Sequence, residues 1–73
     1  MNSNDTTISA VVNGRTHVLD AGTTVAGVLN AVGAPSTGVA VAVNGAVVPR
    51  TEWDHTIVSD GAVVEILTAV QGG

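Results

Sequence analysis

The chain has 73 residues, a formal net charge of −4 at pH 7, two arginines with no lysine, and no cysteine. A chain of this length forms a single domain, and the lack of cysteine excludes disulfides, thiolate metal sites and a thiol nucleophile of its own. The acidic balance argues against a nucleic-acid partner, because phosphate contacts need clustered basic residues. It suits a basic protein partner, although simple solubility explains it as well.

The N-terminal residues 1–7 are polar and lack the charged-then-apolar layout of a signal peptide. No apolar run approaches the roughly 18 residues that a membrane span requires. We therefore expect a cytoplasmic protein that does not bind membranes, with residues 1–7 as a flexible extension.

The first predicted element is a β-hairpin. A β-branched strand over 8–12 ends at Asn13-Gly14, and a second strand follows over 16–20. Asn-Gly between apolar segments is the strongest short hairpin signal, because a type I′ turn needs two residues that tolerate positive φ. In the first strand, we expect Ala10 and Val12 on the buried face.

One helix follows the hairpin. Thr23 or Thr24 can cap its N-terminus through a side-chain hydroxyl, and Gly33 followed by Pro35 ends it. The apolar residues between them recur at helical spacing and form a single stripe. Its members are Val25, Val28, Leu29 and Val32.

A second hairpin and a final strand complete the chain. The strand 39–43 leads through Asn44-Gly45 into 46–48, and the last and longest strand covers 62–70. Between them, Trp53 is the only aromatic residue of the chain, and we expect its ring to cover one end of the core.

The predicted order β-β-α-β-β-β indicates an α+β fold of the β-grasp (ubiquitin-like) type, a mixed sheet of about five strands packed on one main helix. The final strand belongs in the middle of the sheet, parallel to the first. We expect the β-grasp domain to cover residues 8–69 and a flexible diglycine tail to cover 70–73.

Alternation along the last strand predicts a partner-binding surface. Val64 and Ile66 should point towards the helix, whereas Val63, Leu67 and Ala69 should lie on the sheet face that no helix covers. An apolar patch there is a plausible docking site. The pattern leaves open the alternative that neighbouring strands half-bury these side chains.

The C-terminal tail carries the most informative group of the chain. Val70 and Gln71 lead into Gly72 and Gly73, and two residues without a Cβ can pass through a narrow slot in a partner protein. The Gly73 carboxylate is ionised at neutral pH and is a poor electrophile until an oxygen becomes part of a leaving group, most simply by adenylation with ATP. We expect Val70 and Gln71 to contact the partner and Gly72 to provide steric clearance.

The side chains show no enzymatic constellation. Asp54 and His55 are adjacent and would point apart, and His17 has no acidic or cysteine neighbour at metal-ligand spacing. Both histidines are interpreted as solvated surface residues. We therefore expect no catalysis by this chain alone, no bound metal and no permanently bound cofactor.

Several segments of the chain form a characteristic ordered set. They are Val11-Val12-Asn13-Gly14, Thr24-Val25, Val41-Ala42-Val43-Asn44-Gly45, Val48-Pro49-Arg50 with Trp53, Asp60-Gly61-Ala62-Val63-Val64-Glu65-Ile66, and Gln71-Gly72-Gly73. In this order they resemble the ThiS family, the β-grasp sulfur carriers of thiamin thiazole biosynthesis. The resemblance covers about residues 10–73, and it departs from the family at Ala62, where an acidic residue is expected.

The resemblance implies a mechanism centred on Gly73. In this family a ubiquitin-activating-like enzyme adenylates the terminal carboxylate with ATP, and sulfur from a persulfide donor replaces AMP to give a thiocarboxylate. Thiazole synthase then accepts the sulfur. Gly72 matches the penultimate glycine of the family.

Other functions are compatible with the same features. The small subunit of molybdopterin synthase has this fold and tail, and a related carrier supplies sulfur to cysteine or methionine synthesis. A protein modifier would join Gly73 to a target lysine, and a β-grasp binding module would have an inert tail. The segment from Pro49 to Trp53 and the Gln71 before the diglycine favour the thiazole carrier.

Overall fold

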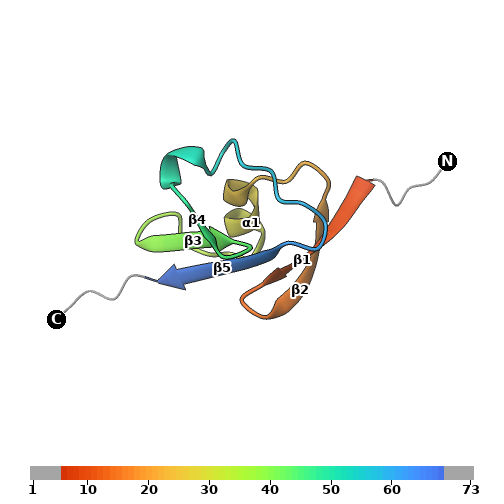
Figure 1. Ribbon diagram of the computed structural model, residues 1–73, viewed down its shortest axis with the longest axis horizontal. Coiled ribbons are helices and arrows are strands. Elements are labelled where there is room, and N and C mark those ends of the chain that lie inside the picture. The colour runs from red at the N-terminus through yellow and green to blue at the C-terminus, as the bar shows by residue number, and fades with distance from the viewer. Residues whose placement is uncertain (1–5, 69–73) are drawn as a thin grey trace.

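The computed structural model describes residues 6–68 and confirms the β-grasp prediction (Figure 1). The elements follow in the predicted order, with one additional 3₁₀ turn before the last strand. They are β1 (Thr7–Val12), β2 (Arg15–Asp20), α1 (Val25–Ala31), β3 (Val39–Val43), β4 (Ala46–Val48), the 3₁₀ turn η2 (Arg50–Glu52) and β5 (Val63–Thr68).

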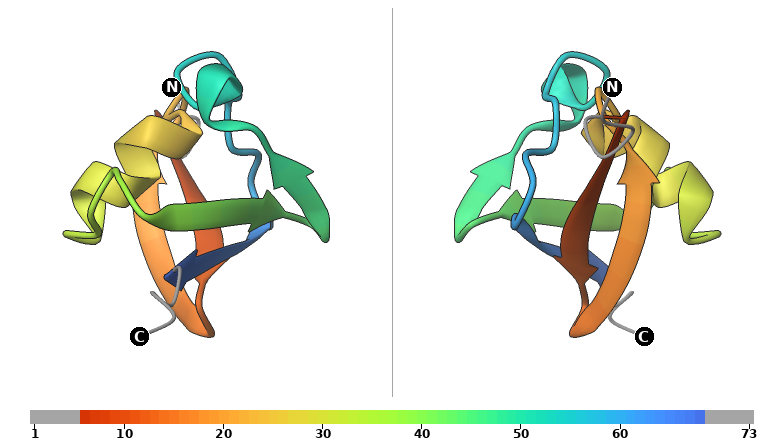
Figure 2. Two further views of the ribbon diagram at one scale, coloured as in Figure 1. Left: turned by 90° about the vertical axis from the view of Figure 1, so that its left-hand side faces the viewer. Right: turned by 90° about the vertical axis from the view of Figure 1, so that its right-hand side faces the viewer.

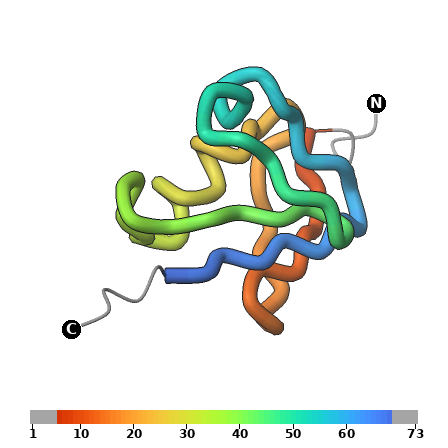
Figure 3. Tube along the Cα trace, turned by 60° about the vertical axis from the view of Figure 1, so that its left-hand side comes forward, coloured from red at the N-terminus to blue at the C-terminus, as the bar shows by residue number. Residues whose placement is uncertain are grey.

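The final strand lies in the middle of the sheet, as predicted. The strand order is β2-β1-β5-β3-β4, with β5 parallel to β1 and antiparallel to β3. Figure 3 follows β5 along the sheet towards the C-terminal end of the chain. The first residues of β5 therefore have a strand on each side, and its last residues are paired with β3 alone.

The helix is capped at both ends by local sequence. The Thr24 hydroxyl accepts a hydrogen bond from the Gly27 amide at 3.2 Å, which satisfies one of the free N–H groups of the first turn. At the other end Gly33 adopts a φ of 73°, and the amide of Ala34 donates to the carbonyl of Leu29 at 2.9 Å. This is a Schellman termination, which glycine favours because it has no Cβ.

The core lies between α1 and one face of the sheet, and the other face has no helix over it (Figure 2). The predicted apolar stripe supplies the helix side, although Val32 is only partly buried. Ala10 and Val12 are buried, as predicted. The other buried apolar residues are Leu19, Val25, Val28, Leu29, Val41, Trp53, Val58, Ala62 and Val64.

Trp53 closes one end of this core and is 6% exposed. Its indole N–H donates to the carbonyl of Val48 at 2.9 Å, so that the single polar atom of the ring has a partner despite its burial. Its own carbonyl accepts from the amide of Ala26 at 3.2 Å, which connects the segment after η2 to the first turn of α1. The predicted packing of the ring against the core is confirmed.

Candidate functional site: the final strand, its two faces and the comparisons

The strand β5 leads directly to the predicted reactive terminus. Thr68 is the last residue that the structure describes. The predicted site residues Ala69, Val70, Gln71, Gly72 and Gly73 lie outside the described residues.

Two asparagine side chains hold β5 in place. Asn13 and Asn44 occupy the turns of the two hairpins with φ of 50° and 52°, as the Asn-Gly signals predicted. The Asn13 side chain also accepts from the amide of Ile66 at 2.8 Å and donates to the carbonyl of Ile66 at 3.2 Å. The Asn44 side chain accepts from the amide of Val63 at 2.9 Å. We call these contacts the asparagine bridges.

The asparagine bridges matter because the pairing of β1 with β5 is short. It joins only Val11 to Val63 and Val12 to Val64, after which β1 ends and the chain turns at Asn13. The side-chain amide of Asn13 then supplies one donor and one acceptor to β5, as a further strand residue would. The sequence signals predicted the turn and missed this second role, because it depends on a residue 53 positions further along the chain.

The open face of the sheet carries the predicted apolar patch. Val63 is 45% exposed and Leu67 is 61% exposed, whereas Val64 is fully buried and Ile66 packs against the core. The alternation predicted for the last strand is therefore confirmed for its described residues. The neighbouring strands cover about half of Val63, as the alternative expected, whereas Leu67 is mostly exposed.

Strand pairing extends this patch across the sheet. Val11 is paired with Val63, and Ala40 is paired with Leu67. Ala42 lies between Glu65 on one side and Val47 on the other, and Val47 is 73% exposed. We call this surface the sheet-face patch; it consists of Val11, Ala40, Ala42, Val47, Val63 and Leu67 around the Glu65 carboxylate.

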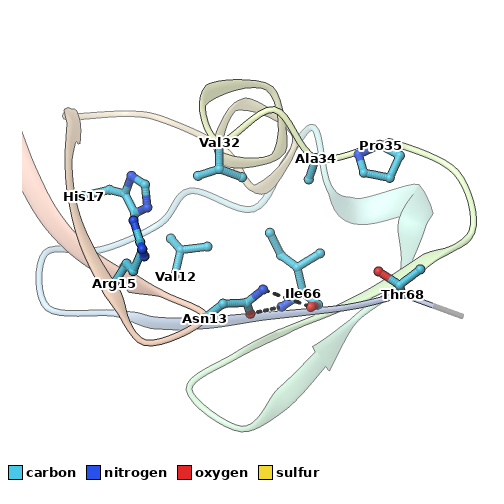
Figure 4. Close-up of a pocket in the computed structure, with 9 residues that line it drawn as sticks. All are labelled: Val12, Asn13, Arg15, His17, Val32, Ala34, Pro35, Ile66 and Thr68. Carbon is cyan, nitrogen blue, oxygen red and sulfur yellow. Dashed lines mark hydrogen bonds between the residues drawn. The ribbon is translucent and has the colours of Figure 1, made fainter.

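The opposite face holds a pocket that the sequence did not predict. It has a volume of about 440 Å³ and lies between β2, the end of α1 and β5 (Figure 4). Arg15 and His17 are two residues apart on β2, so their side chains point to the same face. His17, which was interpreted as a solvated surface residue, is half-buried and lines this pocket with Arg15.

The remaining polar candidates are not assembled into a site. Asp54 and His55 are both exposed, and among residues 6–68 no group of three His, Cys, Asp or Glu side chains is placed to hold a metal ion. Within the same residues, no helix is long and apolar enough to cross a membrane.

Comparisons with known proteins agree with this arrangement. The model of the ThiS family matches residues 4–73, a range that includes the terminal diglycine. The fold is similar to the crystal structure of the thiamine biosynthesis protein ThiS from Geobacter metallireducens, with a TM-score of 0.75 and 33% sequence identity over 90% of this chain and 100% of that one. None of the curated proteins matches the chain significantly. Because the family model covers nearly the whole sequence, the chain belongs to the ThiS family.

Proposed function

We propose that this protein is a sulfur carrier of thiamin biosynthesis whose Gly73 carboxylate is the group that carries sulfur. The observation that carries the proposal is the family match, which extends from residue 4 through the diglycine to Gly73. The similarity to a thiamine biosynthesis protein over the full length of that protein supports the same pathway.

The chemistry that we propose proceeds on the main chain of Gly73 in the pocket of a partner enzyme. A carboxylate oxygen attacks the α-phosphorus of ATP and pyrophosphate leaves, which gives an acyl-adenylate. The terminal sulfur of a persulfide attacks the acyl carbon and expels AMP, and a thiol then cleaves the resulting acyl disulfide, leaving the thiocarboxylate on Gly73. This chain supplies the substrate group and no catalytic side chain, and ATP is a substrate of the partner.

The partners in this proposal are an adenylating enzyme, a persulfide donor and thiazole synthase as sulfur acceptor. The sheet-face patch is the surface that would dock on them, with Val70 and Gln71 as tail contacts and Gly72 as the narrow position. An apolar rim around Glu65 fits a partner surface that presents a basic side chain surrounded by apolar residues.

Intact and top-down mass spectrometry tests the proposed chemistry. The protein is incubated with ATP, the adenylating enzyme and a persulfide source, and we expect one oxygen of Gly73 to be replaced by sulfur. The exchange must be localised to the terminus, because oxidation of Met1 or Trp53 changes the mass by nearly the same amount. An unchanged terminus with a demonstrably active enzyme and donor would contradict the proposal, and amine-linked conjugates instead of a thiocarboxylate would indicate a protein modifier.

Replacing Leu67 by Asp should lower the kcat/KM of adenylation about 30-fold, the effect expected when a central interface residue worth about 2 kcal/mol is lost. Leu67 lies on the sheet-face patch and is 61% exposed, so we expect the substitution to leave the fold intact. Ile57→Asp is the matched control, because Ile57 is also 61% exposed and lies outside the patch. Equal losses for the two variants would contradict docking through this surface.

A further inference from the structure

The pocket on the helix side of β5 has polar groups at its ends and an apolar middle (Figure 4). Arg15 and His17 lie at one end and Thr68 lies at the other. A volume of about 440 Å³ is within the range of small-ligand sites. The apolar side chains between the two ends are those of Val12, Val32, Ala34, Pro35 and Ile66.

Hydrogen bonds hold both walls of this pocket in place. On the β5 side, the Asn13 side chain accepts from the amide of Ile66 at 2.8 Å and donates to its carbonyl at 3.2 Å (Figure 4). On the helix side, the amide of Ala34 donates to the carbonyl of Leu29 at 2.9 Å, and the ring of Pro35 fixes its own φ. The pocket is therefore formed in the absence of a ligand, and a ligand does not have to order it.

The apolar middle presents surface that the fold leaves uncovered. Val32, Ala34 and Ile66 pack against the core but are only partly buried. All three line the pocket, so a ligand with a hydrocarbon body would cover more of their surface. Removal of apolar surface from water favours binding roughly in proportion to the area that is covered.

The polar end offers donors that have no partner within the protein. Neither the Arg15 guanidinium nor the His17 imidazole forms a hydrogen bond or an ion pair with any of residues 6–68. The two residues are two positions apart on β2, and Figure 4 shows their side chains next to each other. The guanidinium is a planar fork of N–H donors, and even a neutral imidazole has one N–H. Together they can bind both oxygens of a carboxylate.

The charge of the pocket fits a ligand with a single negative charge. Among the described residues that line it, Arg15 alone has a permanent charge, and the chain as a whole has a net charge of −4. A phosphate with two negative charges would leave one of them uncompensated and would be repelled by the acidic chain. A neutral apolar molecule would gain nothing from the guanidinium. A carboxylate on a hydrocarbon body matches both parts of the pocket.

We propose that this pocket binds a small monocarboxylate, with its carboxylate on Arg15 and His17 and its hydrocarbon body in the apolar middle. Arg15 is exposed, so its ion pair with the ligand is weak, and the smallest ligands of this class bind in the millimolar range. The proposal concerns a site on the helix side of the sheet and does not rest on the proposed function.

Nuclear magnetic resonance of the full-length ¹³C-labelled protein during titration with hexanoate tests this proposal. Methyl groups report on the face to which their side chain points, so we expect saturable shifts at Val32 and Ile66 and none at Val47 and Leu67 of the sheet-face patch. Hexan-1-ol has the same hydrocarbon chain without the charge, and inorganic phosphate has charge without a hydrocarbon chain. Each should bind at least about fivefold more weakly than hexanoate, because each lacks one of the two contacts.

Two substitutions and one control separate the contributions to binding. Arg15→Gln should weaken the binding of hexanoate about fivefold, the scale of an exposed ion pair, and leave that of hexan-1-ol unchanged. Arg50→Gln is the matched control, because it removes the same charge from η2, which does not line the pocket. Ala34→Leu adds a larger side chain to the apolar middle and should weaken the binding of both ligands. Unchanged methyl resonances away from the pocket confirm that each variant is folded.

Equal affinity for hexanoate and hexan-1-ol would overturn the proposal, because the charge would then play no part. Equal affinity for hexanoate and phosphate would overturn it too, since the apolar middle would not contribute. Equal weakening by Arg15→Gln and Arg50→Gln, or shifts at Val47 and Leu67 in place of the pocket, would show that binding is unspecific. The titration uses no ATP, enzyme or sulfur donor, so its outcome is independent of whether Gly73 is loaded with sulfur.

Discussion

Deletion of Gly72 and Gly73 should reduce sulfur loading to background while the folded domain remains intact. The new terminus would be Gln71, whose side chain is too wide for a slot shaped to glycine. The free energy of unfolding should change by less than about 0.5 kcal/mol, because every buried core residue that the structure describes lies between Ala10 and Val64. Intact mass spectrometry measures the loading, and thermal unfolding followed by circular dichroism measures the stability.

The control for this deletion is a truncation of equal length at the other end, removal of Asn2 and Ser3. It should leave loading unchanged. A second variant, Gly72→Val, keeps the terminal carboxylate and adds a β-branched side chain beside it. We expect loading about 100-fold slower, the cost of displacing a reacting group by about 1 Å. Loading of the shortened chain at the normal rate would show that the diglycine is not the reactive end.

Replacement of Trp53 by Ala should remove about half of the free energy of unfolding at 25 °C. Removing a buried aromatic side chain costs about 3–5 kcal/mol, and a domain of this size has a total stability of roughly 4–11 kcal/mol. The loss combines the apolar contacts at the end of the core with the hydrogen bond from the indole N–H to Val48. Urea unfolding followed by far-ultraviolet circular dichroism is the suitable measurement, since Trp53 is the only aromatic residue and its fluorescence is lost with it.

Trp53→Phe separates the two contributions. It keeps most of the apolar volume and removes the donor, which leaves the carbonyl of Val48 without this partner, so we expect a loss of about 1–2 kcal/mol. If Trp53→Ala cost less than about 1 kcal/mol, the ring would not be part of the core. Sulfur loading of the Trp53→Ala variant should fall in proportion to the fraction of molecules that remain folded. Trp53 is distant from Gly73 in the sequence and takes no part in the proposed reaction.

The sequence predicted the fold because its signals are local. Positive φ at Asn13 and Asn44, the cap at Thr24 and the glycine after α1 each depend on a few neighbouring residues, and alternation along β5 placed Val63 and Leu67 on the open face. These signals determined the order of the elements. With two hairpins already formed, the position predicted for the last strand was the middle of the sheet, where it is found.

The contacts that the sequence did not predict join distant segments. Nothing near Asn13 indicates that its side chain binds the backbone of Ile66. The spacing of Arg15 and His17 places both on one face of β2, but the pocket exists only because Val32 and Ala34, at the end of α1, lie opposite them. A pattern within one strand contains no information about the element that packs across from it.

The two candidate surfaces lie on opposite faces of β5. Leu67 belongs to the sheet-face patch, and Ile66 and Thr68 line the pocket. Substitutions at alternate positions of β5 can therefore change one surface and leave the other unaltered.

The position of β5 also determines how the domain responds to a mechanical load. The hydrogen bonds from β5 to β1 and β3 run across the axis of β5, so a pull on the C-terminal end that acts along this axis is parallel to the strand. Such a force shears all of these bonds at once, whereas a pull on an edge strand at right angles would open them one after another. With the Asn13 side chain bonded to Ile66 near the loaded end, the carrier can be held under tension by its tail while the domain behind it stays folded.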